Sequence, residues 1–158
     1  AFYEALGRPD IDIMLETKDK NLSAVKCIHC TRPDLPFKTL EEAWAKYQYT
    51  LLEHSYPDYL ALRSLLADWA GCTPIAFYTL VESALRQPLQ TRQAVYAARQ
   101  VWGCLRGRAT PRQEAAFEEK LESYGRGKLP LESLKSYLYR LAVEHGCAHL
   151  IHSYYFTL

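Results

Sequence analysis

The sequence predicts a mainly α-helical protein, an antiparallel bundle of six or seven helices preceded by one β/α unit. Three observations support this prediction. Apolar residues recur at helical spacing throughout residues 39–158. Helix-start signals, a hydroxyl side chain near a proline or a glutamate, separate these stretches. A short strand-like apolar run occurs once, before residue 16. Because the expected helices are joined by short loops, antiparallel packing follows.

The β/α unit is predicted by residues 10–20, which read Asp-Ile-Asp-Ile-Met-Leu-Glu-Thr-Lys-Asp-Lys. The apolar run ends at the carboxylate of Glu16, and a helical pattern follows over residues 19–28. In parallel β/α sheets, a carboxylate at the C-terminal end of a strand lies where active sites are built. One unit cannot form a sheet. We therefore expect the chain, which begins at Ala1, to be the end of a larger enzyme.

The helical region has recognisable starts and stops. Two prolines in residues 31–36 indicate a boundary, so we expect a β/α unit at 1–30, a linker at 31–38 and a helical domain at 39–158. Thr39 and Glu42 form a capping-box pattern for a helix that reaches about residue 53. Further helices are expected to start at Ser55, Thr73, Thr110 and Leu129, each close to a proline, the helix from Ser55 reaching Gly71. Left-handed helix ends are expected at Gly107 and Gly146.

Composition limits the classes of function. The chain has 158 residues, of which 49% are apolar and 23% charged, as in a folded globular domain. The net charge is +1, so contact with a nucleic acid would have to depend on a local basic patch. No apolar run approaches the length of a membrane span. Five cysteines without secretory features predict reduced thiols and a cytoplasmic location.

The N-terminal residues also carry a family resemblance. Residues 12–16 (Asp-Ile-Met-Leu-Glu), the two lysines at 18 and 20, and Leu22, Ala24 and Val25 resemble the last strand and helix of the UV-damage endonucleases. That family consists of TIM-barrel repair nucleases with clustered divalent metals. The resemblance implies that Glu16 is a metal ligand, for manganese or a similar ion, and that Lys18 lies at the catalytic site. The alternatives are a buried strand that ends at a helix cap for Glu16, and a solvated strand end for Lys18.

The same resemblance implies that most of the enzyme lies elsewhere. The other metal ligands of the family would be on strands that these residues lack, so we expect no metal-dependent incision by the 158 residues alone. The implied partners are DNA and the missing N-terminal barrel. The helical domain is not expected to need a cofactor.

The helical region resembles a second family. Residues 46–55 (Lys-Tyr-x-x-Thr-Leu-Leu-x-His-Ser), Thr91-Arg92 and residues 124–131 (Tyr-Gly-Arg-Gly-Lys-Leu-Pro-Leu) resemble the YbgA-type domain of unknown function. In some bacterial proteins that domain is attached to a desulfidase that acts on thiolated RNA bases, which makes RNA an alternative partner. The chain departs from the family at Tyr96 and Gln100, where asparagine and histidine are frequent. No activity can be transferred from this resemblance.

A run of basic residues predicts a nucleic-acid contact. Between Glu82 and Glu114 the chain has no acid and six arginines, namely Arg86, Arg92, Arg99, Arg106, Arg108 and Arg112. Three of them are spaced by seven and would share one helix face. Guanidinium groups bind phosphates with two parallel hydrogen bonds, so we expect sequence-independent contact with the DNA backbone. Alternatively, these arginines pair with the acidic helix that follows, and the domain docks a repair partner or self-associates.

Two weaker patterns remain open. Cys27 and Cys30 have the spacing of half a zinc site or of a redox pair, but no second ligand pair lies near them in the sequence. Ordinary half-buried thiols are the simpler interpretation. His54 beside Ser55 lacks an identifiable acid that would orient a nucleophilic pair, so we expect a helix-capping histidine there.

Overall fold

The structure of the protein, a computed structural model, describes residues 22–32, 34–68 and 71–158. These residues form eight α-helices and one short 3₁₀ helix, with no strand among them. The mainly α-helical class is therefore confirmed. The strand expected before residue 16 lies outside the described residues, and no β/α unit of a barrel is seen in the part that is described.

The helices follow one another with short connections. They are α2 (Leu22–Thr31), α3 (Phe37–His54), α4 (Tyr56–Ala67), α5 (Pro74–Leu85), α6 (Thr91–Leu105), α7 (Pro111–Gly125), α8 (Leu131–Glu144) and α9 (Ala148–Ile151), with η1 at Tyr154–Phe156. The region expected to hold six or seven helices thus contains seven α-helices, α3 to α9. None of the described helices combines the length and the apolar character needed to cross a membrane.

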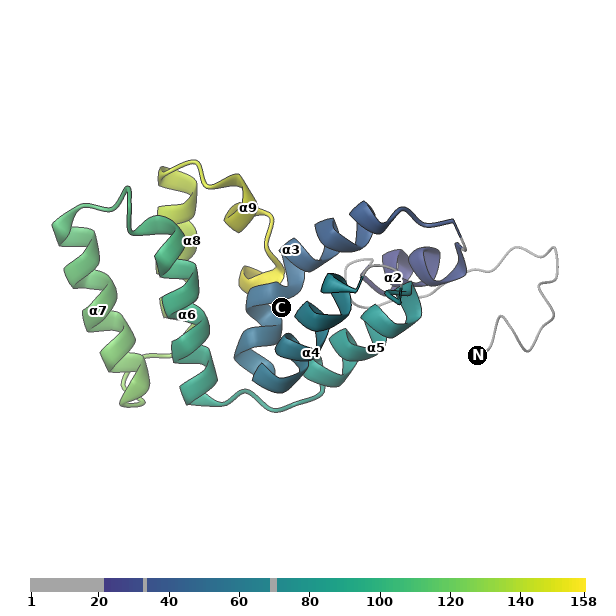
Figure 1. Ribbon diagram of the computed structural model, residues 1–158. Helices are drawn as coiled ribbons and strands as arrows, with labels where there is room; N and C mark the ends of the chain where they lie inside the picture. Colours follow the sequence, from purple (N-terminus) through teal and green to yellow (C-terminus); the bar gives the residue numbers. More distant parts are fainter. Residues whose placement is uncertain (1–21, 33, 69–70) are drawn as a thin grey trace.

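The long helix α3 lies between two groups of helices (Figure 1). On one side α6, α7 and α8 run up, down and up, joined by loops at 106–110 and 126–130. On the other side α4 and α5 pack against α3 and against each other. Helix α2 lies at the far end on α5, where Lys26 pairs with Glu82 and His29 Nδ1 lies 2.7 Å from the Tyr78 hydroxyl.

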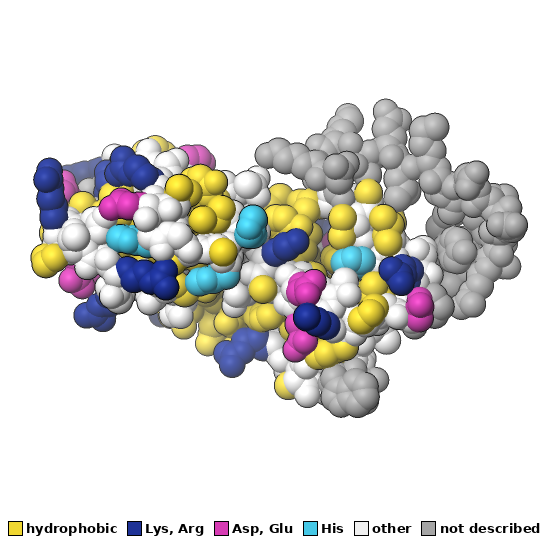
Figure 2. Space-filling view, turned by 90° about the horizontal axis from the view of Figure 1, so that it is seen from above, with side chains coloured by type: hydrophobic (Ala, Val, Ile, Leu, Met, Phe, Trp, Pro, Cys, Tyr) yellow, Lys and Arg dark blue, Asp and Glu magenta, His cyan; other side chains and the backbone are white. Residues whose placement is uncertain are grey.

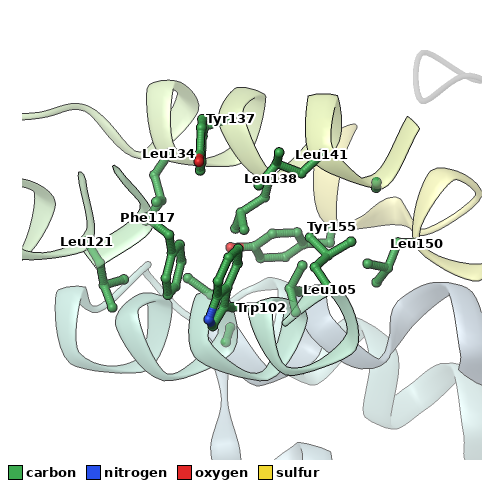
Figure 3. Close-up of a cluster of buried hydrophobic side chains, with 14 of the residues drawn as sticks. Trp102, Leu105, Phe117, Leu121, Leu134, Tyr137, Leu138, Leu141, Leu150 and Tyr155 are labelled. Atoms are coloured by element: carbon green, nitrogen blue, oxygen red, sulfur yellow. The ribbon is translucent and has the colours of Figure 1, made fainter. Parts of the chain in front are cut away.

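Each group of helices has its own apolar core, and α3 contributes to both. Leu51 belongs to the core shared with α4 and α5, whereas the next residue, Leu52, belongs to the core of α6 to α9. Adjacent residues point about 100° apart on a helix, so one helix can serve two cores. In the second core the Trp102 and Phe117 rings stack at 4.5 Å (Figure 3). In the first core Trp44 is half-buried and packs against Tyr59.

Most of the predicted helix starts are confirmed. Ser55 Oγ accepts a hydrogen bond from the Asp58 amide at 3.3 Å, and Thr73 Oγ1 accepts one from Ala76 at 3.2 Å. At α7 the cap is a full capping box, in which Thr110 and Gln113 each bond the backbone amide of the other. A proline stands in the first turn of all three helices, where its missing N–H leaves no bond unmade.

Three predicted helix boundaries were wrong. Helix α4 ends at Ala67 and does not reach Gly71. The capping box at Thr39 does not form, because α3 has already begun at Phe37 and Thr39 donates its amide to the Pro36 carbonyl at 2.9 Å. Proline disfavours the helical conformation in the residue before it, so the chain enters the helix directly after Pro36. Gly107 is not left-handed either. The positive-φ glycines among the described residues are Gly127 (φ 71°), which was missed, and Gly146 (φ 62°), as predicted.

Candidate nucleic-acid interface

The arginine stripe predicted on one helix lies along α6, but two of its three members are paired with acids. Arg99 holds Glu118 of α7 with both terminal nitrogens, at 3.1 and 3.2 Å. Arg106 Nε lies 3.5 Å from Glu114 of the same helix. Pairing with the acidic helix that follows was the alternative interpretation of these arginines, and these two pairs agree with it. For Arg92, at the start of α6, no described acid lies within salt-bridge distance.

The other three arginines are spread over different surroundings. Arg86 ends α5 and pairs with Glu82 at 3.4 Å. Arg108 donates to the His145 carbonyl at 2.8 Å, so it ties the α6–α7 loop to the end of α8. Arg112 is exposed in the first turn of α7, and among the described residues it has no ion-pair partner. The six arginines therefore do not form one continuous basic patch.

The paired arginines nevertheless remain on the surface. The side chains of Arg99 and Arg106 are 53% and 71% exposed, and their glutamate partners are both 49% exposed. Exposed ion pairs of this kind contribute only about 0–1 kcal/mol, so a phosphate can replace the carboxylate at little cost. Figure 2 shows lysine and arginine side chains interspersed with acids and histidines over the α6–α8 part of the molecule. The electrostatic field is thus locally mixed.

A hollow beside the unpaired Arg92 was not predicted from the sequence. It has a volume of about 450 Å³ and is lined by Leu52, Tyr56, Gln90, Arg92, Gln93 and Tyr96. Leu52 lies on α3, Tyr56 begins α4, and Tyr96 lies one turn after Arg92 on α6, so three helices form its walls. One signal for it was present in the sequence. Tyr96 lies four residues after Arg92, so the two side chains share one face of a helix.

A buried ion pair links α3 to α8. Lys135 Nζ of α8 lies 2.6 Å from Oε1 of Glu53, whose side chain is fully buried at the end of α3. The ammonium also lies 4.6 Å from the centre of the Tyr155 ring. Burial raises the pKa of Glu53, and Lys135 acts in the opposite direction. A carboxylate sealed from solvent cannot reach a ligand on the surface, so this pair serves the fold.

The cysteine and histidine patterns provide no metal centre in the described residues. No group of three or more His, Cys, Asp or Glu residues there could hold a metal ion. Cys27 and Cys30 are free thiols on α2, and the intervening His29 contacts Tyr78. Burial lowers the pKa of His29, helped by the nearby charges of Arg32 and Lys46.

His54 and Ser55 each have a structural role. His54 Nδ1 lies 2.8 Å from the Gln87 carbonyl, and Ser55 caps α4. Glu16 and Lys18, the residues implied at a metal-dependent catalytic site, lie outside the described residues. Their roles remain predictions.

Comparison with known proteins places the helical part in a family. A family model described as "Protein of unknown function (DUF1722)" matches residues 48–158. The chain belongs to the DUF1722 family. The match begins within α3 and covers the paired arginines and the hollow.

The DUF1722 chain is also similar to a UV DNA damage endonuclease from Clostridium perfringens (strain 13 / Type A). The identity is 28% over 138 residues, which is 84% of this chain and 32% of that protein. The chain therefore spans about a third of the length of this curated relative. No solved structure matches the chain. The resemblance to the UV-damage endonucleases is thus supported at the level of distant similarity, whereas the barrel remnant and the YbgA-type assignment remain predictions.

Proposed function

We propose that this DUF1722 chain is part of a UV-damage repair endonuclease, in which its helical domain is an accessory module that binds the DNA backbone. The observation that carries this proposal is the similarity to the Clostridium enzyme, which extends over 84% of the chain. Such a role places the protein in the cytoplasm. Incision would belong to a barrel elsewhere in the enzyme, with Glu16 among its divalent-metal ligands and Lys18 beside them.

The exposed arginines of α6 and α7 suit a sequence-independent contact. Arg92 and Arg112 have no acidic partner among the described residues, so each is available to a phosphate. Arg99 and Arg106 can exchange their glutamates for phosphate oxygens, because both members of each pair are about half exposed or more. Phosphates carry no base identity, so this contact fixes the position of the protein on DNA without reading its sequence.

The experiment compares two variants with the same loss of charge. R99Q/R106Q removes the paired arginines of α6, and R32Q/K38Q removes two cations near α2 and the start of α3, far from α6 (Figure 1). Duplex affinity is measured by fluorescence anisotropy over a range of salt concentrations. We expect R99Q/R106Q to weaken binding and to lower the salt slope by about 2, and R32Q/K38Q to change the slope little. Equal behaviour of the two variants would contradict a contact at α6.

A third variant tests the competition between glutamate and phosphate. E114Q/E118Q removes the acids that hold the two arginines, and E41Q/E42Q makes the same charge change on α3. If DNA replaces the glutamates, the first variant binds duplex more tightly than the second. Should the arginines serve only the fold, the first variant gains no more affinity than the second and loses stability.

Self-association is the second candidate, and one observation favours it. Tyr139 and Val143, one turn apart on α8, are 41% and 51% exposed. Two large apolar side chains on one exposed helix face are suited to a protein contact. Light scattering separates the two proposals, because a stable dimer that is indifferent to DNA favours this one. Competition between transfer RNA and duplex DNA tests the third possibility, an RNA-directed module.

A further inference from the structure

We propose that the hollow between Tyr56, Tyr96 and Arg92 binds an unpaired nucleotide, with its base on the tyrosines and its phosphate at Arg92. This inference rests on the proposed nucleic-acid function and adds the form of nucleic acid that is recognised there. The backbone contact at Arg99 and Arg106 suits a duplex. The hollow suits a base that has left the stack, either in a single strand or extruded from a damaged duplex.

The first support is an exposed pair of aromatic rings. Tyr56 and Tyr96 are 42% and 45% exposed, and their ring centres lie 5.9 Å apart in an edge-to-face arrangement. Behind them, Tyr56 stacks on Tyr59 at 6.1 Å, and Tyr59 packs on Trp44 at 5.2 Å. The column fixes the orientation of the Tyr56 ring before any ligand arrives. Rings fixed in this way can stack any base, since every base has a π-face.

The second support is a site for an anion at the edge of the same hollow. Arg92 is the second residue of α6, and its guanidinium is not paired with any described acid. The first turn of α6 contains no acidic residue, and no side chain of the N-cap, Gln90, bonds its amides. The amides of a helix's first turn have no partner within the helix. They therefore reinforce the arginine as a phosphate site.

The third support is a pair of amide side chains in the wall. Gln90 and Gln93 both line the hollow, and Gln93 Nε2 donates to Gln90 Oε1 at 3.3 Å. Side-chain amides can hydrogen-bond the pairing edge of a base, and that edge is free only when the base is unpaired.

The apolar wall and the volume of the hollow also suit a nucleotide. Leu52, which is 2% exposed, also lines the hollow and gives it an apolar surface. The volume of about 450 Å³ lies in the range of small-molecule sites. Stacking rings, an anion site and polar amides thus converge in one place, as a nucleotide requires.

The test uses the full chain and two labelled single strands of about twelve nucleotides. One strand is oligothymidine, and the other has the same phosphates but abasic sites in place of bases. Tyr96→Leu removes the ring while keeping an apolar side chain. Tyr96→Phe keeps the ring. Tyr139→Leu is the matched control, since Tyr139 is 41% exposed and also has an edge-to-face neighbour, Phe156, at 5.2 Å.

We expect Tyr96→Leu to weaken binding of oligothymidine roughly 5- to 100-fold, the range measured when one stacking side chain is removed. Tyr96→Phe and Tyr139→Leu should stay within about twofold of the unmodified protein, since both leave a ring in the hollow. The affinity for the abasic strand and for duplex should not change in Tyr96→Leu. Circular dichroism melting checks that the variants are folded.

The possible failures can be told apart. If oligothymidine binds Tyr96→Leu as tightly as the unmodified protein, or if the abasic strand binds as well as oligothymidine, the stacking site is overturned while the backbone contact stands. If duplex binding is absent but oligothymidine binds in a Tyr96-dependent way, the duplex role fails and the stacking site stands. If neither nucleic acid binds, both proposals fail.

Discussion

Lys135 Nζ lies 2.6 Å from the Oε1 atom of Glu53, and this buried contact joins the end of α3 to the first half of α8. Glu53 is fully buried, and its second oxygen has no hydrogen-bond partner in the described residues. Taking a carboxylate out of water costs several kcal/mol, which a close ammonium can offset. The link between the end of α3 and α8 therefore depends on a polar contact at the edge of the apolar core of α6 to α9.

Lys135→Met should destabilise the protein by about 3–5 kcal/mol, because it leaves a buried carboxylate uncompensated. Methionine keeps most of the volume of lysine, so the loss reports the charge and not a cavity. Urea unfolding at neutral pH measures it. The control is E53Q/K135M, in which no charge remains, and it should recover most of the lost stability. Equal destabilisation in the two variants would show that packing, and not charge, is responsible.

The cost of Lys135→Met should also depend on pH. Burial raises the pKa of Glu53 in the folded protein above its usual value of 4.5, and the lysine opposes that rise. Without the lysine the folded pKa rises further. A raised folded pKa contributes stability below the unfolded value and loses it as pH rises through the folded pKa. The penalty should therefore be smaller near pH 4.5 than at pH 7, and E53Q/K135M should show no such difference.

Removing the hydroxyl of Tyr155 should not destabilise the protein. This hydroxyl is buried without a hydrogen-bond partner in the described residues, and burial raises the pKa of the phenol well above its usual value. Tyr155→Phe should therefore be neutral or stabilising by up to about 1 kcal/mol. Tyr137→Phe is the matched comparison, since the Tyr137 hydroxyl donates to the Gln113 carbonyl at 2.9 Å. It should cost about 1 kcal/mol in thermal or urea unfolding.

Helix caps give a third contrast. Thr110→Ala removes one half of the capping box of α7 and should cost about 0.5–2 kcal/mol. Thr39→Ala should cost far less, because Thr39 lies inside the first turn of α3 and caps nothing. Alanine is also the better helix former of the two residues. Denaturant midpoints of the two variants measure the difference. A larger loss of stability in Thr39→Ala than in Thr110→Ala would show that Thr39 does cap α3.

Glycine substitutions test the left-handed positions. Gly127→Ala and Gly146→Ala should each cost about 1–2 kcal/mol, since a Cβ is unfavourable at φ values of 71° and 62°. No heavy atom would lie within 4 Å of the added Cβ at either position, so the cost is conformational. Gly107→Ala should be neutral or stabilising, because that residue is not left-handed and has open space around it. The melting temperatures of the three variants provide the comparison.

Local signals in the sequence predicted much of this fold. A hydroxyl residue before a proline fixed the starts of α4, α5 and α7, because the cap and the proline act within one turn. The wrong predictions also came from signals within a few residues. Thr39 has a valid capping pattern, but α3 already begins directly after Pro36, three residues earlier. Thr39 therefore lies inside the first turn and does not cap the helix. At Gly107 a glycine after an apolar stretch indicated a left-handed residue, but the chain turned without one.

The site was less predictable. Periodicity predicted Arg92, Arg99 and Arg106 on one face of a helix. Arg92 and Arg99 lie on α6 and Arg106 is its C-cap, but periodicity could not say which of them faces an acid. That depends on the register between α6 and α7. The hollow depends on Tyr56 of α4 and Tyr96 of α6, which are 40 positions apart in the sequence, so no short window of the sequence contains it.

What the sequence determined by itself was the helical class, most helix boundaries and the spacing of the arginines, because each depends on hydrogen bonds and side-chain positions within a few residues. The tertiary structure alone decided the burial of Glu53 against Lys135, the pairing of Arg99 with Glu118, and the meeting of Tyr56 with Tyr96. These contacts are set by how separate helices pack. Packing is the sum of many weak contacts between distant segments, and no local pattern records it.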